Sequence, residues 1–377
     1  MHKNPEIDMD LPETSAFVFE KLEEMGYSPQ RVAGSGITAL AGGKRSGKCF
    51  LLRADMDALP ITEQSGEEFS SQNGNMHACG HDFHTSMLLG AAKLLKRAED
   101  EIEGTIKLVF QPGEETLNGA KAMVKAGILE NPSVSAAAMF HVSSGTPLPS
   151  GAIVVPEGGY FAAASDQFEI TVFGKGGHGA MPQNTIDPLN VLSHLHLALQ
   201  TINSRELTPG EFAVVTVGAM NGGRAHNVIP DFAVMKGTIR TYDEKTRAMI
   251  FERIEAIARG TAETFRARAE VKIRHGCPAV FVDGKVAGDV RAALSKVFGY
   301  AVIDPSAIGG AKLGGSEDFA YVTEKVPSVI MLLSAGGTQE GYEHALHHPM
   351  VRFNEEVLCQ GAAAYAACAI GWLKENK

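Results

Sequence analysis

The chain has 377 residues, of which 44% are hydrophobic and 21% charged, a composition that excludes disordered, fibrous and small disulfide-stapled proteins. Because a single hydrophobic core tends to divide beyond roughly 250–300 residues, we expect two domains. The 34 Lys and Arg against 44 Asp and Glu give a net charge of −10 without a run of like charge, which argues against nucleic acid and membrane surfaces as partners.

Up to about residue 165, apolar runs of strand length alternate with helical patterns, as in a sheet covered by helices. Residues 49–55 and 104–111 are predicted to form buried strands, with a helix over residues 86–95 between them. A second helix is predicted to open at Glu114 and Glu115, because acidic residues suit a first helical turn.

From about residue 166 the pattern changes to that of a smaller α+β unit, in the order β-α-β-β-α-β. Its predicted elements are a strand at 168–174, a helix from Asp187-Pro188 to about 204, strands at 212–220 and 231–241, a helix at 244–269 and a strand at 270–274. After residue 278 the first pattern resumes, with a strand at 326–333 and a closing helix at 354–373. We therefore predict an α/β fold, a mixed sheet flanked by helices, in which a domain of residues 1–165 and 278–377 is interrupted by a ferredoxin-like domain of residues 166–277.

The densest group of metal-binding side chains is the run His77-Ala-Cys-Gly-His-Asp-Phe-His84. Thiolate and imidazole both bind zinc-like cations, and Cys79 and His81 can reach one ion from a turn that leads into a helix. Taken alone, a buried cysteine beside a hydrogen-bonded histidine explains the pair about equally well.

The adjacent Glu114 and Glu115 favour the metal interpretation. They follow a predicted buried strand and Gly113, so one carboxylate can bind a cation while the other stands beside the bound water as a general base. An acidic first helical turn is the alternative.

Four more side chains lie near predicted strand ends, namely His141, His347, Asp55 and Asp57. The histidines are further metal donors, and the aspartates could orient a metal-bound imidazole. Because α/β folds place their ligand sites at strand ends, this convergence is hard to explain by packing.

Nine motifs, in order along almost the whole chain, resemble the amidohydrolase branch of the aminoacylase and glutamate-carboxypeptidase metallopeptidases, which contains hippurate hydrolases and auxin-conjugate amidohydrolases. They are ADMDALP (54–60), MHACGHDFHTSMLLGAAKLL (76–95), LVFQPGEE (108–115), FHV (140–142), GKGGHGAMP (174–182), AHNVIP (225–230), GTIRTYD (237–243), SEDFAYV (316–322) and LHHP (346–349). The resemblance implies a dinuclear-metal catalytic domain interrupted by a smaller lid domain. Members usually carry a helix before a segment like LHxxPE, whereas this sequence begins inside that segment.

By this resemblance Glu114 is the catalytic base, and the metal ligands are Cys79, His81, Glu115, His141 and His347. Cys79 stands where other branches use a bridging aspartate. His347 fits the pattern LHxP, whereas His348 stands at its variable position. In the lid, the resemblance implies that His178 supports the tetrahedral oxyanion.

The resemblance also makes Asn227 and Arg240 candidates for binding the acyl-amino acid and its carboxylate, since a guanidinium offers a carboxylate two parallel donors. A surface cation on an edge strand explains Arg240 about equally well. Glu317 and Asp318 are either acids behind the ligands or helix caps.

The N-terminal segment lacks the basic and apolar regions of a signal peptide, and no later stretch reaches the ~18 consecutive apolar residues of a spanning helix. The five cysteines contain no CxxC pair and are odd in number, which favours a reducing compartment. We therefore expect a cytoplasmic protein.

Together these features predict a metal-dependent amidohydrolase that cleaves N-acyl amino acids, with two divalent cations per subunit, zinc or manganese first and cobalt or nickel also compatible. A dipeptidase or carboxypeptidase of the wider family is the alternative. A silent binder of amino-acid conjugates would be expected to lose the base, yet Glu114 is present. We expect a homodimer formed through the lid domain, with His178 acting in trans; a monomer whose GGHG turn is a flexible tip is the competing interpretation.

Overall fold

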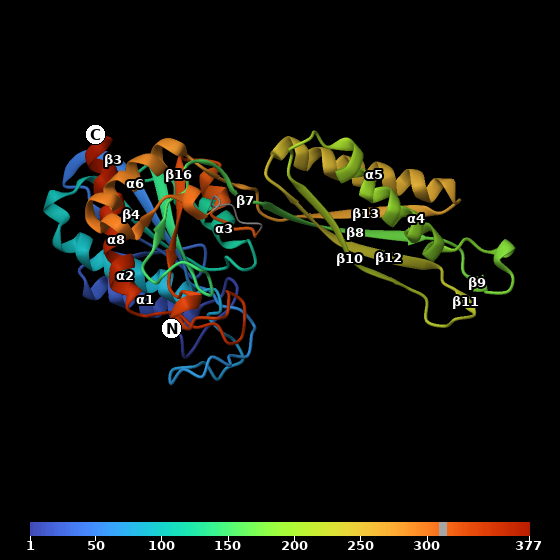
Figure 1. Ribbon diagram of the computed structural model, residues 1–377, viewed down its shortest axis with the longest axis horizontal. Coiled ribbons are helices and arrows are strands. Elements are labelled where there is room, and N and C mark those ends of the chain that lie inside the picture. The colour runs from blue at the N-terminus through green and yellow to red at the C-terminus, as the bar shows by residue number, and fades with distance from the viewer. Residues whose placement is uncertain (309–314) are drawn as a thin grey trace. The chain divides into compact units, whose positions relative to one another are not determined.

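The computed structural model describes residues 1–308 and 315–377, which form two compact units. The first unit comprises Met1–Phe161, the described part of 280–312, and Glu317–Lys377. The inserted unit comprises Ala162–Ala279 with Gly315 and Ser316. The chain therefore leaves the first unit and returns to it after the insertion, as the colours of Figure 1 show.

The first unit is built on an eight-stranded mixed sheet with the strand order β1-β2-β4-β3-β5-β16-β6-β15. Its strands are β1 (Gln30–Val32), β2 (Gly36–Gly42), β3 (Arg45–Asp55), β4 (Glu103–Gln111), β5 (Val134–Ser143), β6 (Ile153–Val154), β15 (Val302–Ile303) and β16 (Ser328–Ser334). The four central strands β4, β3, β5 and β16 run parallel, so their carboxyl ends meet at one edge. A separate short pair joins β7 (Gly159–Ala162) to β14 (Val280–Val282).

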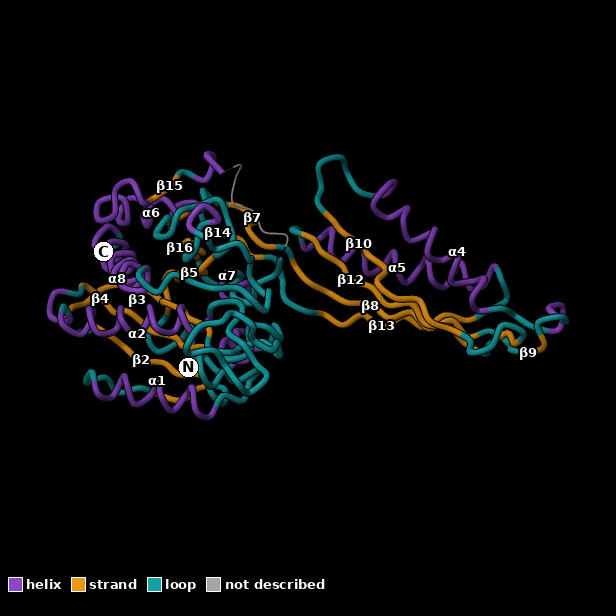
Figure 2. Tube along the Cα trace, turned by 60° about the horizontal axis from the view of Figure 1, so that its bottom comes forward, coloured by secondary structure: helices purple, strands orange, loops and turns teal. Residues whose placement is uncertain are grey.

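Helices flank this sheet, as the sequence predicted. They are α1 (Pro12–Glu24), α2 (His81–Arg97), α3 (Gly119–Lys125), α6 (Gly284–Phe298), α7 (Ala320–Thr323) and α8 (Val357–Glu375). Helices α1, α2, α8 and α6 contact one another in that order and lie in a row in Figure 2. Helices α3 and α7 form a separate contact. Strand β3 is buried from Cys49 to Asp55, as expected for a parallel strand covered on both faces.

Helix α8 is long and apolar enough to cross a membrane by length and composition alone. More than half of its most apolar window is buried inside the unit. It packs against α2, α6 and β3, and Tyr365 of α8 donates a hydrogen bond to the carbonyl of Arg53 at 2.8 Å. These contacts are those of a core helix.

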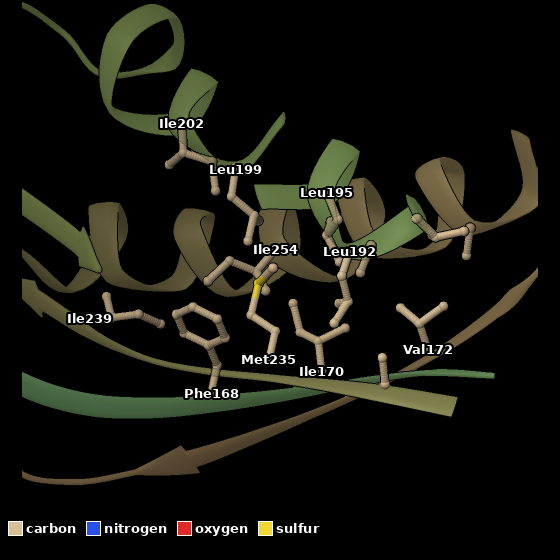
Figure 3. Packing of buried hydrophobic residues seen from close by; sticks show 14 of the residues in the cluster. Phe168, Ile170, Val172, Leu192, Leu195, Leu199, Ile202, Met235, Ile239 and Ile254 are labelled. Carbon is tan, nitrogen blue, oxygen red and sulfur yellow. The ribbon is translucent and has the colours of Figure 1, made fainter. Parts of the chain in front are cut away.

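The inserted unit is a four-stranded antiparallel sheet, with the order β10-β12-β8-β13, on which two helices pack. Its elements are β8 (Ala164–Phe173), β9 (Gly177–His178), α4 (Pro188–Thr201), β10 (Ala213–Gly222), β11 (Val228–Ile229), β12 (Phe232–Thr241), α5 (Glu244–Thr264) and β13 (Arg268–His275). Figure 3 shows its core, where Leu192, Leu195 and Ile254 of the helices meet Ile170 and Met235 of the sheet. The carboxylate of Asp187 accepts a hydrogen bond from Leu189 N and so caps α4, the helix that the sequence predicts from Asp187-Pro188.

Candidate metal centre

Five side chains from four separate segments of the sequence gather beyond the carboxyl ends of the central parallel strands. Three close pairs join them: Cys79 Sγ lies 3.6 Å from Nε2 of His141 and 3.3 Å from Nε2 of His347, and His347 Nε2 lies 3.5 Å from Glu115 Oε1. His81 Nε2 lies 3.9 Å from the same Glu115 oxygen. Donors around one zinc-sized cation are separated by about 3.3–3.7 Å, because each sits roughly 2.0–2.3 Å from the ion.

The donors form two overlapping groups, each with its ligand atoms within 4.8 Å of one another. Cys79, His81 and His141 make one group, and Cys79, Glu115 and His347 make the other. Cys79 therefore belongs to both. The residues that the sequence singled out as metal ligands are thus brought together by the fold in an arrangement with room for two cations.

Two buried donor atoms have no hydrogen-bond partner among the described residues, His81 Nε2 and Glu115 Oε1. Buried polar atoms are almost always paired, so an unpaired nitrogen facing an unpaired carboxylate oxygen calls for a cation between them. The other ring nitrogen of His81 lies 2.9 Å from the carbonyl oxygen of Asp57. That contact orients the imidazole and leaves Nε2 as the free donor.

Gly80 sets the spacing between Cys79 and His81. It adopts φ +80° immediately before α2, a left-handed conformation that favours glycine. A Cβ at this position would overlap Cγ2 of Val142, the residue that follows His141 on β5. The local backbone therefore brings the thiol and the first residue of α2 onto the end of β5.

Glu114 and Glu115 do not open a helix, so that prediction is wrong: they lie in a turn, and α3 begins only at Gly119. The carboxylate of Asp57 accepts hydrogen bonds from both of their backbone amides, at 3.0 and 3.1 Å. Leu117, at φ +58°, then turns the chain away from a helical path. Asp57 thus fixes the backbone of the glutamate pair and contacts His81 as well.

Backbone strain marks the loop that supplies His347. This residue adopts φ +66°, which is uncommon outside glycine and is found at functional sites where surrounding contacts enforce it. Its amide donates a hydrogen bond to the carbonyl of Ala78 at 2.9 Å, which ties the loop to the segment that bears Cys79. His348 points elsewhere and stacks on His344, with ring centroids 4.2 Å apart.

Asp55 lies next to the two donor groups and contacts His84 and Arg53. One of its oxygens lies 2.5 Å from His84 Nδ1, and the other accepts a hydrogen bond from Arg53 at 2.7 Å. His84 Nε2 in turn accepts a hydrogen bond from the amide of Val142 at 2.8 Å, next to His141. The aspartate therefore holds the ends of β3, α2 and β5 in register.

Arg53, which is not among the predicted site residues, is a fully buried guanidinium that faces several acids. It lies 3.0 Å from Glu317, 2.9 Å from Asp318 and 2.7 Å from Asp55. Both acids of the SEDF segment are therefore buried behind the glutamate pair, and Glu317 also caps the turn by accepting a hydrogen bond from Phe319 N at 2.9 Å. A basic residue inside an otherwise apolar strand was the signal that could have identified it.

The electrostatics of the site match these positions. Burial and then the charges of Glu317 and Asp318 raise the pKa of Glu114 well above its usual value. Burial would raise the pKa of Cys79, but His141, His347 and His81 outweigh it and lower this pKa to about 6. The site therefore favours a thiolate ligand at Cys79, whereas Glu114 holds a proton readily.

The three site residues predicted in the inserted unit lie at two separate places: His178 and Asn227 are close together, and Arg240 lies apart from them. His178 on β9 is exposed and pairs with Val228 on β11, directly after Asn227. Arg240 lies near the other end of β12, where its guanidinium donates to the carbonyl of Ile239 at 3.1 Å. Figure 1 shows β9 and β11 beyond the end of the sheet where β8 ends and β12 begins.

Comparisons with known proteins agree with this picture. The profile described as Peptidase family M20/M25/M40 matches residues 51–370. The chain is similar to N-acetyl-L-cysteine deacetylase of Bacillus subtilis (strain 168), with 38% identity over 96% of this chain and 84% of the relative. It is also similar to IAA-amino acid hydrolase ILR1-like 2 of Arabidopsis thaliana, with 39% identity over 100% of this chain and 84% of the relative.

Among solved structures, the crystal structure of a dinuclear metal-binding M20 family peptidase from Bacillus subtilis superposes with a TM-score of 0.83 and 33% identity. The alignment covers 99% of this chain and 95% of that one.

Proposed function

The chain belongs to peptidase family M20/M25/M40, and on that premise we propose that it hydrolyses the amide bond of N-acyl amino acids, releasing a carboxylic acid and a free amino acid. The observation that carries this proposal is the pair of overlapping donor groups that share Cys79. The relatives named as a deacetylase of an N-acetylated amino acid and as a hydrolase of an amino-acid conjugate support the substrate class.

The donor set fits two divalent cations held by Cys79, His81, Glu115, His141 and His347. Such cations, when bound, lower the pKa of water toward ~7 and polarise the scissile carbonyl. Thiolate and imidazole suit zinc, while the carboxylate also admits manganese, cobalt or nickel.

Glu114 is the proposed base. The residue is 6% exposed, and its carboxylate stands beside the donor groups, since Glu114, Glu115 and His81 also have ligand atoms within 4.8 Å of one another. In the reaction it takes a proton from the attacking water and returns it to the nitrogen of the leaving amine. The raised pKa of Glu114 suits a group that must hold this proton between the two steps.

The inserted unit supports a dimer in which the partner supplies His178. β12 adjoins the β9–β11 pair at Phe232, and Arg240 lies eight residues further along the strand. At about 3.3 Å per residue, Arg240 is therefore roughly 26 Å from that end of the strand. One small substrate cannot span that distance. If Arg240 binds the carboxylate while His178 and Asn227 reach the carbonyl, the two sets must come from different copies of the chain.

The direct test of the reaction is a panel of N-acyl amino acids, with dipeptides and C-terminal peptide amides as comparison substrates. Metal-free protein is incubated with each divalent cation, and the free amino acid is quantified. We expect hydrolysis of N-acyl amino acids to exceed that of the peptides, and Glu114→Gln to be the inactive control. Preferential cleavage of dipeptides or C-terminal residues would replace the proposal with the peptidase alternative.

Subunit mixing tests the dimer. Inactive His178→Ala and inactive Glu114→Gln proteins are mixed under conditions that let subunits exchange. A mixed dimer then has one site with both residues intact if His178 acts across the interface, so activity should reappear. Confirmed exchange without recovered activity would show that His178 does not act in trans.

A further inference from the structure

The first ten residues cross three segments that carry or adjoin site residues of the first unit. We call residues 1–10 the N-terminal brace. They contact the turn after His81, the segment after Asp57 and the turn that holds Glu114 and Glu115. No role in the reaction described above falls to these residues.

The first contact is made by His2. Its Nδ1 lies 2.7 Å from Asp82, and its Nε2 lies 3.1 Å from Glu63. The imidazole is 18% exposed, the Glu63 side chain 0% and the Asp82 side chain 7%. Because both ring nitrogens face buried carboxylates, His2 is an imidazolium that donates to both. It therefore clamps the first turn of α2, one residue after His81, to the loop that contains Glu63.

The second contact is backbone pairing beside Asp57. The amide of Ala58 donates to the carbonyl of Glu6 at 2.8 Å, and Ile7 forms a parallel bridge with Ala58. The Glu6 carboxylate accepts a hydrogen bond from Thr14 N at 2.8 Å. Glu6 therefore anchors the brace to the start of α1 through its side chain, and its carbonyl holds the brace beside Ala58, the residue that follows Asp57.

The third contact lies against the glutamate pair. Thr116 donates its hydroxyl hydrogen to Asp8 Oδ1 at 2.7 Å. Met9 packs on Gly113, where a Cβ would overlap the methionine sulfur. Gly113 and Thr116 flank Glu114 and Glu115, so the brace supports this turn from both sides.

We propose that the N-terminal brace positions the metal ligands relative to one another, with His2 as its positioning residue. The inference rests on the proposed function, because the ligands it positions are those assigned above. The three segments are far apart in the sequence, and a stretch of chain that touches all three restrains their separations. Loosening such support around metal ligands typically weakens metal binding about 10–100-fold.

Cobalt(II) provides a readout that does not depend on turnover, because a thiolate ligand such as Cys79 gives bound cobalt a charge-transfer absorption. Cobalt-loaded wild type, His2→Ala and Asp8→Gly are mixed with excess EDTA, and the decay of that absorption is followed. Asp8 has φ +62°, so glycine removes the contact to Thr116 without straining the backbone. Lys3→Ala, at the neighbouring exposed position, is the matched control.

We expect His2→Ala and Asp8→Gly to release cobalt about ten-fold faster than wild type or more, and Lys3→Ala to match wild type. In the cobalt-free proteins, amide hydrogen exchange over residues 79–84 should be faster in His2→Ala, and that over residues 113–117 faster in Asp8→Gly. If His2→Ala does not fold, Asp8→Gly decides the question.

Release at the wild-type rate from both variants would overturn the brace and leave the proposed function standing. A wild-type protein that binds no cobalt with a thiolate signature would overturn the proposed metal site itself, and the brace with it.

Discussion

Cys79 Sγ lies 3.3 Å from Nε2 of His347, although the two residues are 268 positions apart in the chain. The same sulfur also approaches His141, so it stands between two groups of donors. A carboxylate can serve two cations through its two oxygens, whereas at this site the single sulfur atom of Cys79 would serve both donor groups. The chemistry of Cys79 is therefore the first property to test.

Cys79 should behave as a metal ligand and not as a nucleophile. Thiol alkylation at Cys79 should be slow in metal-loaded protein and faster after chelation, because a coordinated thiolate has its charge neutralised. Peptide mapping by mass spectrometry measures this, with exposed Cys359 as the internal control that should react equally in both states. A covalent acyl-Cys79 trapped during turnover would contradict this role.

The two adjacent glutamates should separate into two functions. Glu114→Gln should retain its metals and lose roughly 10²–10⁴ in kcat, as expected when a positioned base is removed. Glu115→Gln should instead lose metal, because its carboxylate belongs to the donor group with Cys79 and His347. Metal analysis beside steady-state kinetics decides this, and an empty Glu114→Gln protein would show that the assignment is reversed.

Gly80 should tolerate substitution less well than Gly66, although both have left-handed backbones, at φ +80° and +78°. An added Cβ at Gly66 meets no atom within 4 Å, whereas at Gly80 it would overlap Val142. We expect Gly66→Ala to cost about 1 kcal/mol and Gly80→Ala about 1–3 kcal/mol more. Urea unfolding followed by Trp372 fluorescence compares them, and equal losses would contradict the steric argument.

The contribution of His2 to stability should fall as the pH rises. Burial would lower its pKa, but hydrogen bonds and charges from Asp82 and Glu63 outweigh burial and raise it from 6.5 to about 9. A folded-state pKa above the unfolded one stabilises the protein fully below pH 6.5, and this stabilisation is lost as the pH rises toward 9.

In metal-free protein, wild type should therefore exceed His2→Gln in free energy of unfolding by about 1–3 kcal/mol at pH 6, allowing for screening of the partly exposed ring. The difference should shrink by pH 9.5. A difference that grows with pH would mean that His2 is neutral in the folded protein.

The sequence predicted the elements whose patterns are strong and local. The buried strand at 49–55 corresponds to the end of β3, and the strand at 104–111 to β4, because mostly apolar runs of strand length leave little alternative. The helix predicted at 86–95 is the middle of α2, whose true start lies five residues earlier. Its first turn carries His81, Asp82 and His84, which are polar yet buried, so hydrophobic periodicity could not reveal it.

The residues that make up the site could be predicted from the sequence, but the contacts that hold them in place could not. Residue types at strand ends and motif resemblance single out the five side chains that the fold gathers, but they do not reveal the turn at Glu114, because its hydrogen bonds go to Asp57, far away in the sequence. Arg53 and His2 were missed for the same reason. Their partners, Glu317 and Asp82, lie 264 and 80 residues away, and only the fold brings such charges together.

Titration of metal-free protein with Mn²⁺ or Co²⁺, with bound metal and hydrolysis of an N-acyl amino acid measured on the same samples, tests the central claim most directly. Two overlapping donor groups predict saturation at about two cations per chain, with activity rising as the second group fills. Full hydrolytic activity in protein shown to contain no metal, or saturation with no hydrolysis of any N-acyl amino acid, would contradict the account.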